Sequence, residues 1–130
     1  MIGRPEQLHA KMVADEEIRK AFQDLQFRTN ETRAKIAQGE VNKTFYLQKK
    51  KLAEATLKNL EPIAADLPIY RAVGRMYLLA TKGSEEQRYK DDVDMYQEKY
   101  SQVEKQKEYL QKGLEDAEKN LRELIQSKRS

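Results

Sequence analysis

The sequence has 130 residues, a length that suits a single domain. Charged residues make up 36% and hydrophobic residues 38%, which argues against a compact globule and indicates either disorder or elongated helices with a narrow apolar seam. The net charge of +3 is a small excess in a nearly balanced set of 25 basic and 22 acidic residues, so it is weak support for nucleic-acid binding.

Several classes of function are excluded because the sequence lacks the features that they require. The chain has no cysteine, which excludes disulfides, thiolate metal sites and cysteine nucleophiles. No apolar run approaches the ~18 residues of a membrane span, and residues 1–11 lack the apolar core of a signal peptide. We therefore expect a cytoplasmic protein without a membrane partner. Residues 1–12 form a polar leader, which is either a tail or an extension of the following helix.

Residues 13–60 form the first predicted helical arm, because their apolar residues recur with a period of 3.5. This alternation of four and three predicts a left-handed coiled coil. Eight of the thirteen seam positions are apolar or aromatic. Those positions are 18, 22, 25, 29, 32, 36, 39, 43, 46, 50, 53, 57 and 60. The polar or small seam residues are either ordinary imperfection or the mark of an arm that bends easily.

The pattern changes in residues 61–84, the linker between the arms. Pro62 and Pro68 are expected to end the first helix and to keep the following residues extended. Gly74-Arg75 suits a two-residue type II′ turn with glycine at the first central position, so a β-hairpin is predicted. The expected cross-strand pairs are Val73 with Met76, Arg71 with Leu78, and Ile69 with Ala80.

Both faces of this hairpin are mainly apolar, although an isolated two-stranded hairpin is marginally stable in water. Either the hairpin folds over its own helices as a capping loop, or partner chains supply the missing strands, which we favour because its edges are unpaired. The residues expected to carry subunit assembly are Ile69, Tyr70, Val73, Gly74, Met76, Tyr77, Leu78 and Leu79.

Residues 85–128 form the second predicted arm, with Ser84 and Gln87 as its expected capping box. Ten of its twelve seam positions are apolar or aromatic. Those positions are 89, 93, 96, 100, 103, 107, 110, 114, 117, 121, 124 and 128.

The two seams have similar lengths, which predicts that the arms pair as an antiparallel coiled coil. If position 60 faces 89, Leu25 faces Leu124 and Tyr46 faces Val103. Lysines dominate residues 41–60 and carboxylates dominate residues 85–99, so opposite charges meet only if the chain folds back. The predicted fold is therefore mainly α, a long antiparallel two-helix coiled coil with a single β-hairpin between the helices.

The arm tips, where the first arm begins and the second ends, are the candidate binding surface. Phe27 and Ile125 lie off the seam, so paired helices bury them poorly. These tips form either a closed terminal layer of core or an exposed apolar patch that holds unfolded polypeptides. The candidate client-binding residues are Ile18, Phe22, Leu25, Phe27, Leu121, Leu124 and Ile125.

Catalytic or cofactor chemistry finds no support in the sequence. His9 is the single histidine and lies in the leader. Asp91, Asp92 and Asp94 lack the glycine and final glutamate of a calcium loop. Lys49-Lys50-Lys51 is either a phosphate contact or, as we favour, a solvated helix face. We expect no enzyme activity, no metal, no cofactor and no nucleic-acid partner.

The sequence resembles the β-class prefoldin subunit family over residues 13–128. The hairpin and the second arm carry most of this resemblance. The matching stretches are IYRAVGRM at 69–76 with Thr81-Lys82, EEIRKAFQDLQ at 16–26, VEKQKEYLQK at 103–112 and EKNLRE at 118–123.

The resemblance implies a subunit of a heterohexameric cochaperone built from α-class and β-class prefoldin subunits. In that family the hairpins build a β-barrel body and no nucleotide is used. Coiled-coil tips hold unfolded clients, notably actin and tubulin chains, and pass them to the cytosolic group II chaperonin. The rival interpretation is a structural coiled-coil tether or spacer without client holding, which would have no need for a hairpin apolar on both faces.

Overall fold

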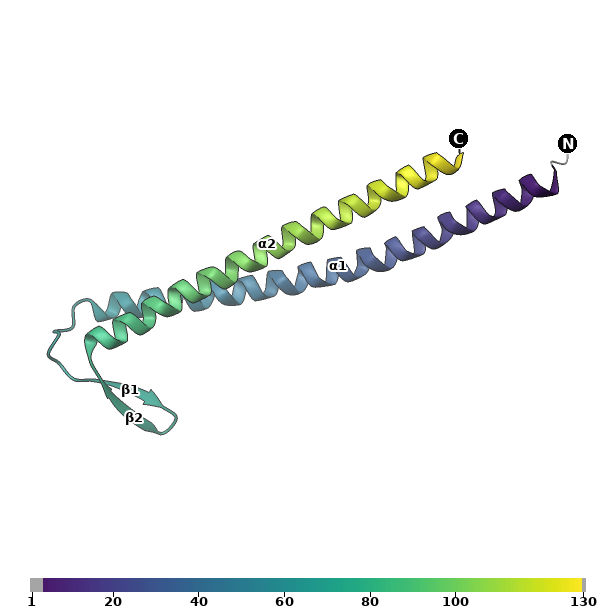
Figure 1. Cartoon of the computed structure of the whole chain (residues 1–130). Helices are drawn as coiled ribbons and strands as arrows, with labels where there is room; N and C mark the ends of the chain where they lie inside the picture. The colour runs from purple at the N-terminus through teal and green to yellow at the C-terminus, as the bar shows by residue number, and fades with distance from the viewer. Residues whose placement is uncertain (1–3, 130) are drawn as a thin grey trace. The chain divides into compact units, whose positions relative to one another are not determined.

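The computed structural model describes residues 4–129 and contains two long helices separated in sequence by a two-stranded sheet (Figure 1). Helix α1 spans Pro5–Leu60, strand β1 spans Ile69–Val73, strand β2 spans Met76–Ala80 and helix α2 spans Lys82–Arg129. This element order confirms the predicted fold class, with one hairpin between two helices.

Helix α1 begins at Pro5, earlier than the residue 13 expected. Proline suits a first helical turn, because the amide proton it lacks would have no partner there. The amides of Gln7 and Leu8 bond to the Arg4 carbonyl at 3.0 and 3.1 Å. The described part of the polar leader is therefore a helical extension of the first arm, whereas residues 1–3 lie outside the described residues.

The chain divides into two compact units, residues 1–38 with 105–130, and residues 39–104. In the first, Glu17 pairs with Lys128 at 3.0 Å and Arg28 lies beside Gly113. In the second, Lys43 pairs with Glu104, and Lys50 donates a hydrogen bond to Gln97 at 2.7 Å. The partner number falls as the α1 number rises, so the helices run antiparallel within each unit.

The predicted seam positions are buried or half-buried in both units except for Phe22 and Lys128. The apolar side chains buried most deeply are Ala53, Leu60 and Leu121. Ala21 is half-buried whereas Phe22 is exposed, so the seam at this turn runs through the smaller side chain. The period of 3.5 is thus confirmed as a coiled-coil seam, with one aromatic residue displaced from it.

The expected helix register in the second unit is wrong by one heptad. The Tyr46 ring stacks on Tyr96 with centroids 6.3 Å apart, and Val103 lies against Gly39 instead of Tyr46. A shift of seven residues keeps every seam position facing the partner helix, so periodicity alone cannot detect it. The predicted charge match gives the antiparallel orientation correctly but not the partner of Lys43. Lys43 pairs with Glu104, which lies outside the acidic stretch 85–99.

The hairpin forms with the predicted pairing, Val73 opposite Met76 and Ile69 opposite Ala80. Gly74 has a φ of 60°, and no non-glycine residue among residues 4–129 has a positive φ. A type I′ turn needs positive φ at both central residues, whereas type II′ needs it only at the first. The backbone therefore agrees with the predicted type II′ turn.

Helix α2 begins three residues before the expected start, and its cap is Thr81 rather than Ser84. The Ser84 amide donates to Thr81 Oγ1 at 3.1 Å, and the Thr81 amide donates to Ser84 Oγ at 3.1 Å. The hydroxyl of each residue thus accepts a hydrogen bond from the backbone amide of the other, as in a capping box shifted by three residues. Gln87 bonds to Asp91 at 2.8 Å and takes no part in the cap.

The burial of Leu121 predicts a measurable core contribution. Leu121→Ala should lower the free energy of unfolding by about 2–3 kcal/mol, because it removes a buried side chain and leaves a cavity. Leu52→Ala, at a leucine that is 62% exposed, should change it by less than about 0.5 kcal/mol. Urea unfolding followed by circular dichroism measures both; equal effects would contradict the seam described here.

The positive φ of Gly74 gives a second prediction. Gly74→Ala should destabilise the hairpin by about 1–2 kcal/mol, because an L side chain is strained in this conformation. Gly83→Ala is the matched control, since its new methyl group meets nothing within 4 Å and its φ is not positive. Amide hydrogen exchange of β1 and β2 should accelerate only in the first variant.

Candidate functional site

The hairpin exposes an apolar surface on both faces. Tyr70, Tyr77 and Leu79 lie on one face and are 63%, 72% and 70% exposed. On the other face Met76 is 65% exposed and Leu78 45%. Because β1 and β2 form a sheet of two strands, each strand also has an edge whose backbone groups no strand of residues 4–129 pairs.

Of the eight residues predicted for assembly, Ile69 is half-buried and Gly74 forms the turn. The other six side chains are exposed. The structure therefore does not use the hairpin as a capping loop over its own helices, which was the alternative interpretation. The six exposed residues are Tyr70, Val73, Met76, Tyr77, Leu78 and Leu79.

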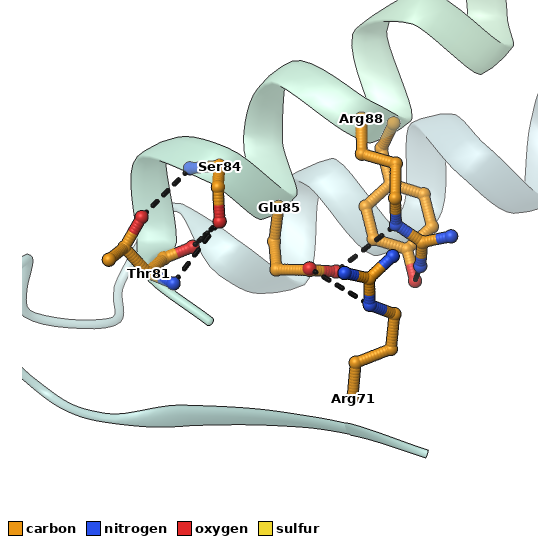
Figure 2. A network of polar contacts seen from close by, with 6 residues as sticks. Arg71, Thr81, Ser84, Glu85 and Arg88 are labelled. Carbon is orange, nitrogen blue, oxygen red and sulfur yellow. Dashed lines mark hydrogen bonds and ion pairs between the residues drawn. The ribbon is translucent and has the colours of Figure 1, made fainter. Parts of the chain in front are cut away.

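One buried carboxylate fixes the hairpin against α2. Glu85 is 3% exposed and lies between two arginines, Arg71 from β1 and Arg88 from α2 (Figure 2). Its oxygens are 3.4 Å from Arg71 Nε and 3.3 Å from Arg88 Nε. Arg88 also donates to the Tyr89 hydroxyl at 3.0 Å. A buried carboxylate without such partners would be costly, so the charge cluster holds β1 beside the first turn of α2.

Arg71 Nε takes part in this cluster through its ion pair with Glu85 and not through a hydrogen bond. Its Nε is buried and makes no hydrogen bond of good geometry, although the Glu85 carboxylate is 3.4 Å away. Removing the carboxylate would leave this nitrogen and the neighbouring guanidinium without compensation. The sequence analysis paired Arg71 with Leu78 but missed its ion pair with Glu85, because only the apolar residues of the hairpin were considered for its role.

Two grooves between the helix segments of the first unit hold predicted client-binding residues. The Phe22 groove has a volume of about 720 Å³. It is lined by Ala10, Lys11, Ala14, Asp15, Ile18, Phe22, Ile125, Lys128 and Arg129. The Leu25 groove, of about 310 Å³, includes Leu25, Leu121 and Leu124. The structure therefore brings six of the seven predicted client-binding residues to these two grooves.

The seven residues differ in how much surface they offer. Phe22 and Phe27 are 53% and 67% exposed, whereas Leu121 is buried and belongs to the helix core. Ile18, Leu25, Leu124 and Ile125 are half-buried. Neither of the two expected arrangements describes the whole cluster, because one leucine is core while two phenylalanines project into solvent.

The Phe22 groove also includes residues that the sequence analysis missed. Ala10, Lys11 and Ala14 were assigned to or beside the polar leader, so they were not expected beside an apolar cluster. The two alanines leave space beside the larger Ile18 and Phe22. The unexpectedly early start of α1 brings Ala10 and Lys11 there, and no motif in the leader indicated it.

Charges at this groove are basic on balance. Lys11, Lys128 and Arg129 line it with one carboxylate, Asp15. On the same helix, Glu16 accepts a hydrogen bond from Arg19 and thereby raises the pKa of that guanidinium.

The described residues hold no arrangement typical of a metal centre or of a membrane-spanning helix. Within residues 4–129, no group of three or more histidine, cysteine or acidic side chains could hold a metal ion. His9 is an exposed residue of α1. In that part of the chain no helix combines the length and apolarity that crossing a membrane requires.

Comparison with known proteins supplies the family. A family model described as "Prefoldin subunit" matches residues 23–128. The chain belongs to the prefoldin subunit family. This family consists of non-enzymatic chaperone subunits, and membership supports a chaperone-associated subunit that assembles with other prefoldin subunits.

Similar prefoldins cover nearly the whole chain. A probable prefoldin subunit 1 of Caenorhabditis elegans is 55% identical over 117 residues, covering 90% of this chain and 100% of that relative. Prefoldin subunit 1 of Homo sapiens is 28% identical over 116 residues, covering 89% and 95%. The prefoldin beta subunit from Thermococcus strain KS-1 superposes with a TM-score of 0.62 at 16% identity, covering 82% and 90%, which shows the shared fold.

The Glu85 cluster predicts how firmly this prefoldin subunit holds its hairpin. Glu85→Gln should lower the free energy of opening the hairpin by about 1–3 kcal/mol, because two arginines lose a charged acceptor. Glu86→Gln is the matched control, since its ion pair with Lys82 is longer, at 3.7 Å, and less buried. Hydrogen exchange of the β1 amides reports the difference; equal protection in both variants would contradict a fixing role for Glu85.

Proposed function

We propose that this chain is one subunit of a hetero-oligomeric, ATP-independent cochaperone of the cytoplasm. It holds unfolded or nascent polypeptides, such as actin and tubulin chains, and transfers them to the cytosolic chaperonin. In this proposal the chain has no enzyme activity, uses no cofactor and needs neither nucleic acid nor a membrane. Exposed apolar side chains on an otherwise charged chain are the observation that supports it most directly.

The hairpin is the proposed assembly surface. Tyr70, Tyr77 and Leu79 present large apolar side chains beside an unpaired strand edge. A partner strand would gain backbone hydrogen bonds along that edge and apolar contacts on the face above it. The Glu85 cluster would present β1 at a fixed angle, so that little ordering entropy is lost on assembly.

The Phe22 groove and Phe27 are the proposed client-holding surface. Unfolded polypeptides share exposed apolar segments rather than a common sequence, so an open apolar groove suits them. One such groove binds weakly. Several subunits that engage the same client would raise the overall affinity by effective concentration, while each single contact still releases readily.

A pair of exposed phenylalanines tests this holding surface. Phe22→Ser with Phe27→Ser should leave co-assembly with partner subunits intact and should weaken suppression of aggregation of a denatured client severalfold. Tyr109→Ser is the matched control, because Tyr109 is a 77% exposed aromatic residue of the same unit that lies outside both grooves. Light scattering of diluted, denatured actin measures holding, and size-exclusion chromatography measures assembly.

The outcomes separate the two proposed roles. Unchanged holding in the phenylalanine variant would contradict this client surface and favour a structural tether. An equal loss in Tyr109→Ser would show that any exposed aromatic residue contributes, which contradicts a defined groove. Failure to assemble would instead place Phe22 and Phe27 in subunit contacts.

A further inference from the structure

Helix α1 carries a second apolar stripe on the side that is not its seam. Val41, Phe45 and Leu52 are separated by four and seven residues, so they share one face of the helix. They are 63%, 49% and 62% exposed, whereas Ala53 and Leu60 on the seam are buried. All three lie in the unit of residues 39–104, and we call them the outer stripe.

Lysines border the outer stripe on both sides. Lys49 follows Phe45 by four residues, and its amine lies 5.5 Å from the centroid of the Phe45 ring. Lys51 and Lys58, seven residues apart, lie along the other side. Neither has an ion-pair partner within residues 4–129.

The nearest carboxylates of α1 pair with seam lysines rather than with Lys51 or Lys58. Glu54 pairs with Lys50 at 3.8 Å, and Glu40 lies 3.3 Å from Lys43. Glu54 nevertheless lies three residues after Lys51 and four before Lys58, so one carboxylate shares the second border with these two lysines. The stripe is therefore an apolar line whose borders carry more lysines than carboxylates.

We propose that the outer stripe docks an acidic amphipathic helix of another protein. Apolar side chains at helical spacing pack against a matching line on a second helix. Lysines at both borders favour glutamate or aspartate at the flanking positions of that helix. The surface uses neither the hairpin nor the two grooves, so this inference goes beyond client holding and subunit assembly.

An apolar line between two basic borders favours a protein helix over RNA. Binding to a phosphate backbone needs positive charge along a groove or face but gains little from three aliphatic or aromatic side chains spaced for helix packing. The exposed Val41 and Leu52 have no hydrogen-bonding groups with which to read bases. A helix with apolar residues at matched spacing covers both the stripe and its borders.

The test uses the full chain assembled with its partner subunits and two fluorescent helical peptides. Both peptides carry leucine at alternating spacings of three and four; one has glutamate at the flanking positions and the other has lysine. The glutamate peptide should bind at least about tenfold more tightly, and high salt should weaken it. Fluorescence anisotropy measures both affinities.

Two variants separate the apolar and ionic parts of the surface. Phe45→Gln with Leu52→Gln should weaken binding of the glutamate peptide by about tenfold or more. Lys49→Glu with Lys51→Glu should reverse the preference between the peptides. Lys90→Glu with Lys105→Glu changes the net charge equally on α2 and should leave the preference unchanged.

Several results would overturn the proposal. These are equal affinity for the two peptides, no detectable binding of the glutamate peptide, or binding that the Phe45→Gln and Leu52→Gln substitutions leave unaltered. Failure of that variant to assemble would assign the stripe to a subunit interface, and loss of client holding would assign it to the client surface. Tighter binding of a single-stranded RNA oligonucleotide, lost in Lys49→Glu with Lys51→Glu, would assign it to nucleic acid.

Discussion

Two paired helices bury side chains only along the line where they meet, and this limit governs the rest of the protein. Each helix turn contributes about one side chain to the shared seam, so the other faces meet solvent. Among residues 4–129 only Ala53, Leu60 and Leu121 are buried apolar residues. A core this thin cannot cover a hairpin that is apolar on both faces, which leaves that surface available to other chains.

The fold could be predicted because its main signals are local. A 3.5-residue period, two prolines and Gly74 fix the helices, the break and the turn through backbone geometry alone. The helix register and the helix cap were not predicted correctly, because in each case two arrangements fit the sequence equally well. The heptad shift that brings Tyr46 to Tyr96 preserves the seam, and Thr81 and Ser84 offer equally suitable capping hydroxyls.

The candidate surfaces were predicted less completely, for reasons that also differ by residue. Phe27 was predicted off the seam and is exposed, since the period alone determines its face. Phe22 was assigned to the seam, but it is exposed and the neighbouring Ala21 is half-buried. Glu85 was hidden because its importance depends on Arg71, a strand residue whose approach to α2 follows from the hairpin's tertiary position.

The distribution of exposed apolar side chains separates the roles of the two helices. On α2, Met95 and Tyr109 are the large exposed apolar residues within the described range, whereas α1 exposes phenylalanines, leucines and valines along much of its length. A helix that serves only as half of a coiled coil gains nothing from apolar residues outside its seam, and such residues favour aggregation. Their concentration on α1 is therefore best explained by contacts with other molecules, while the charged outer face of α2 keeps the pair in solution.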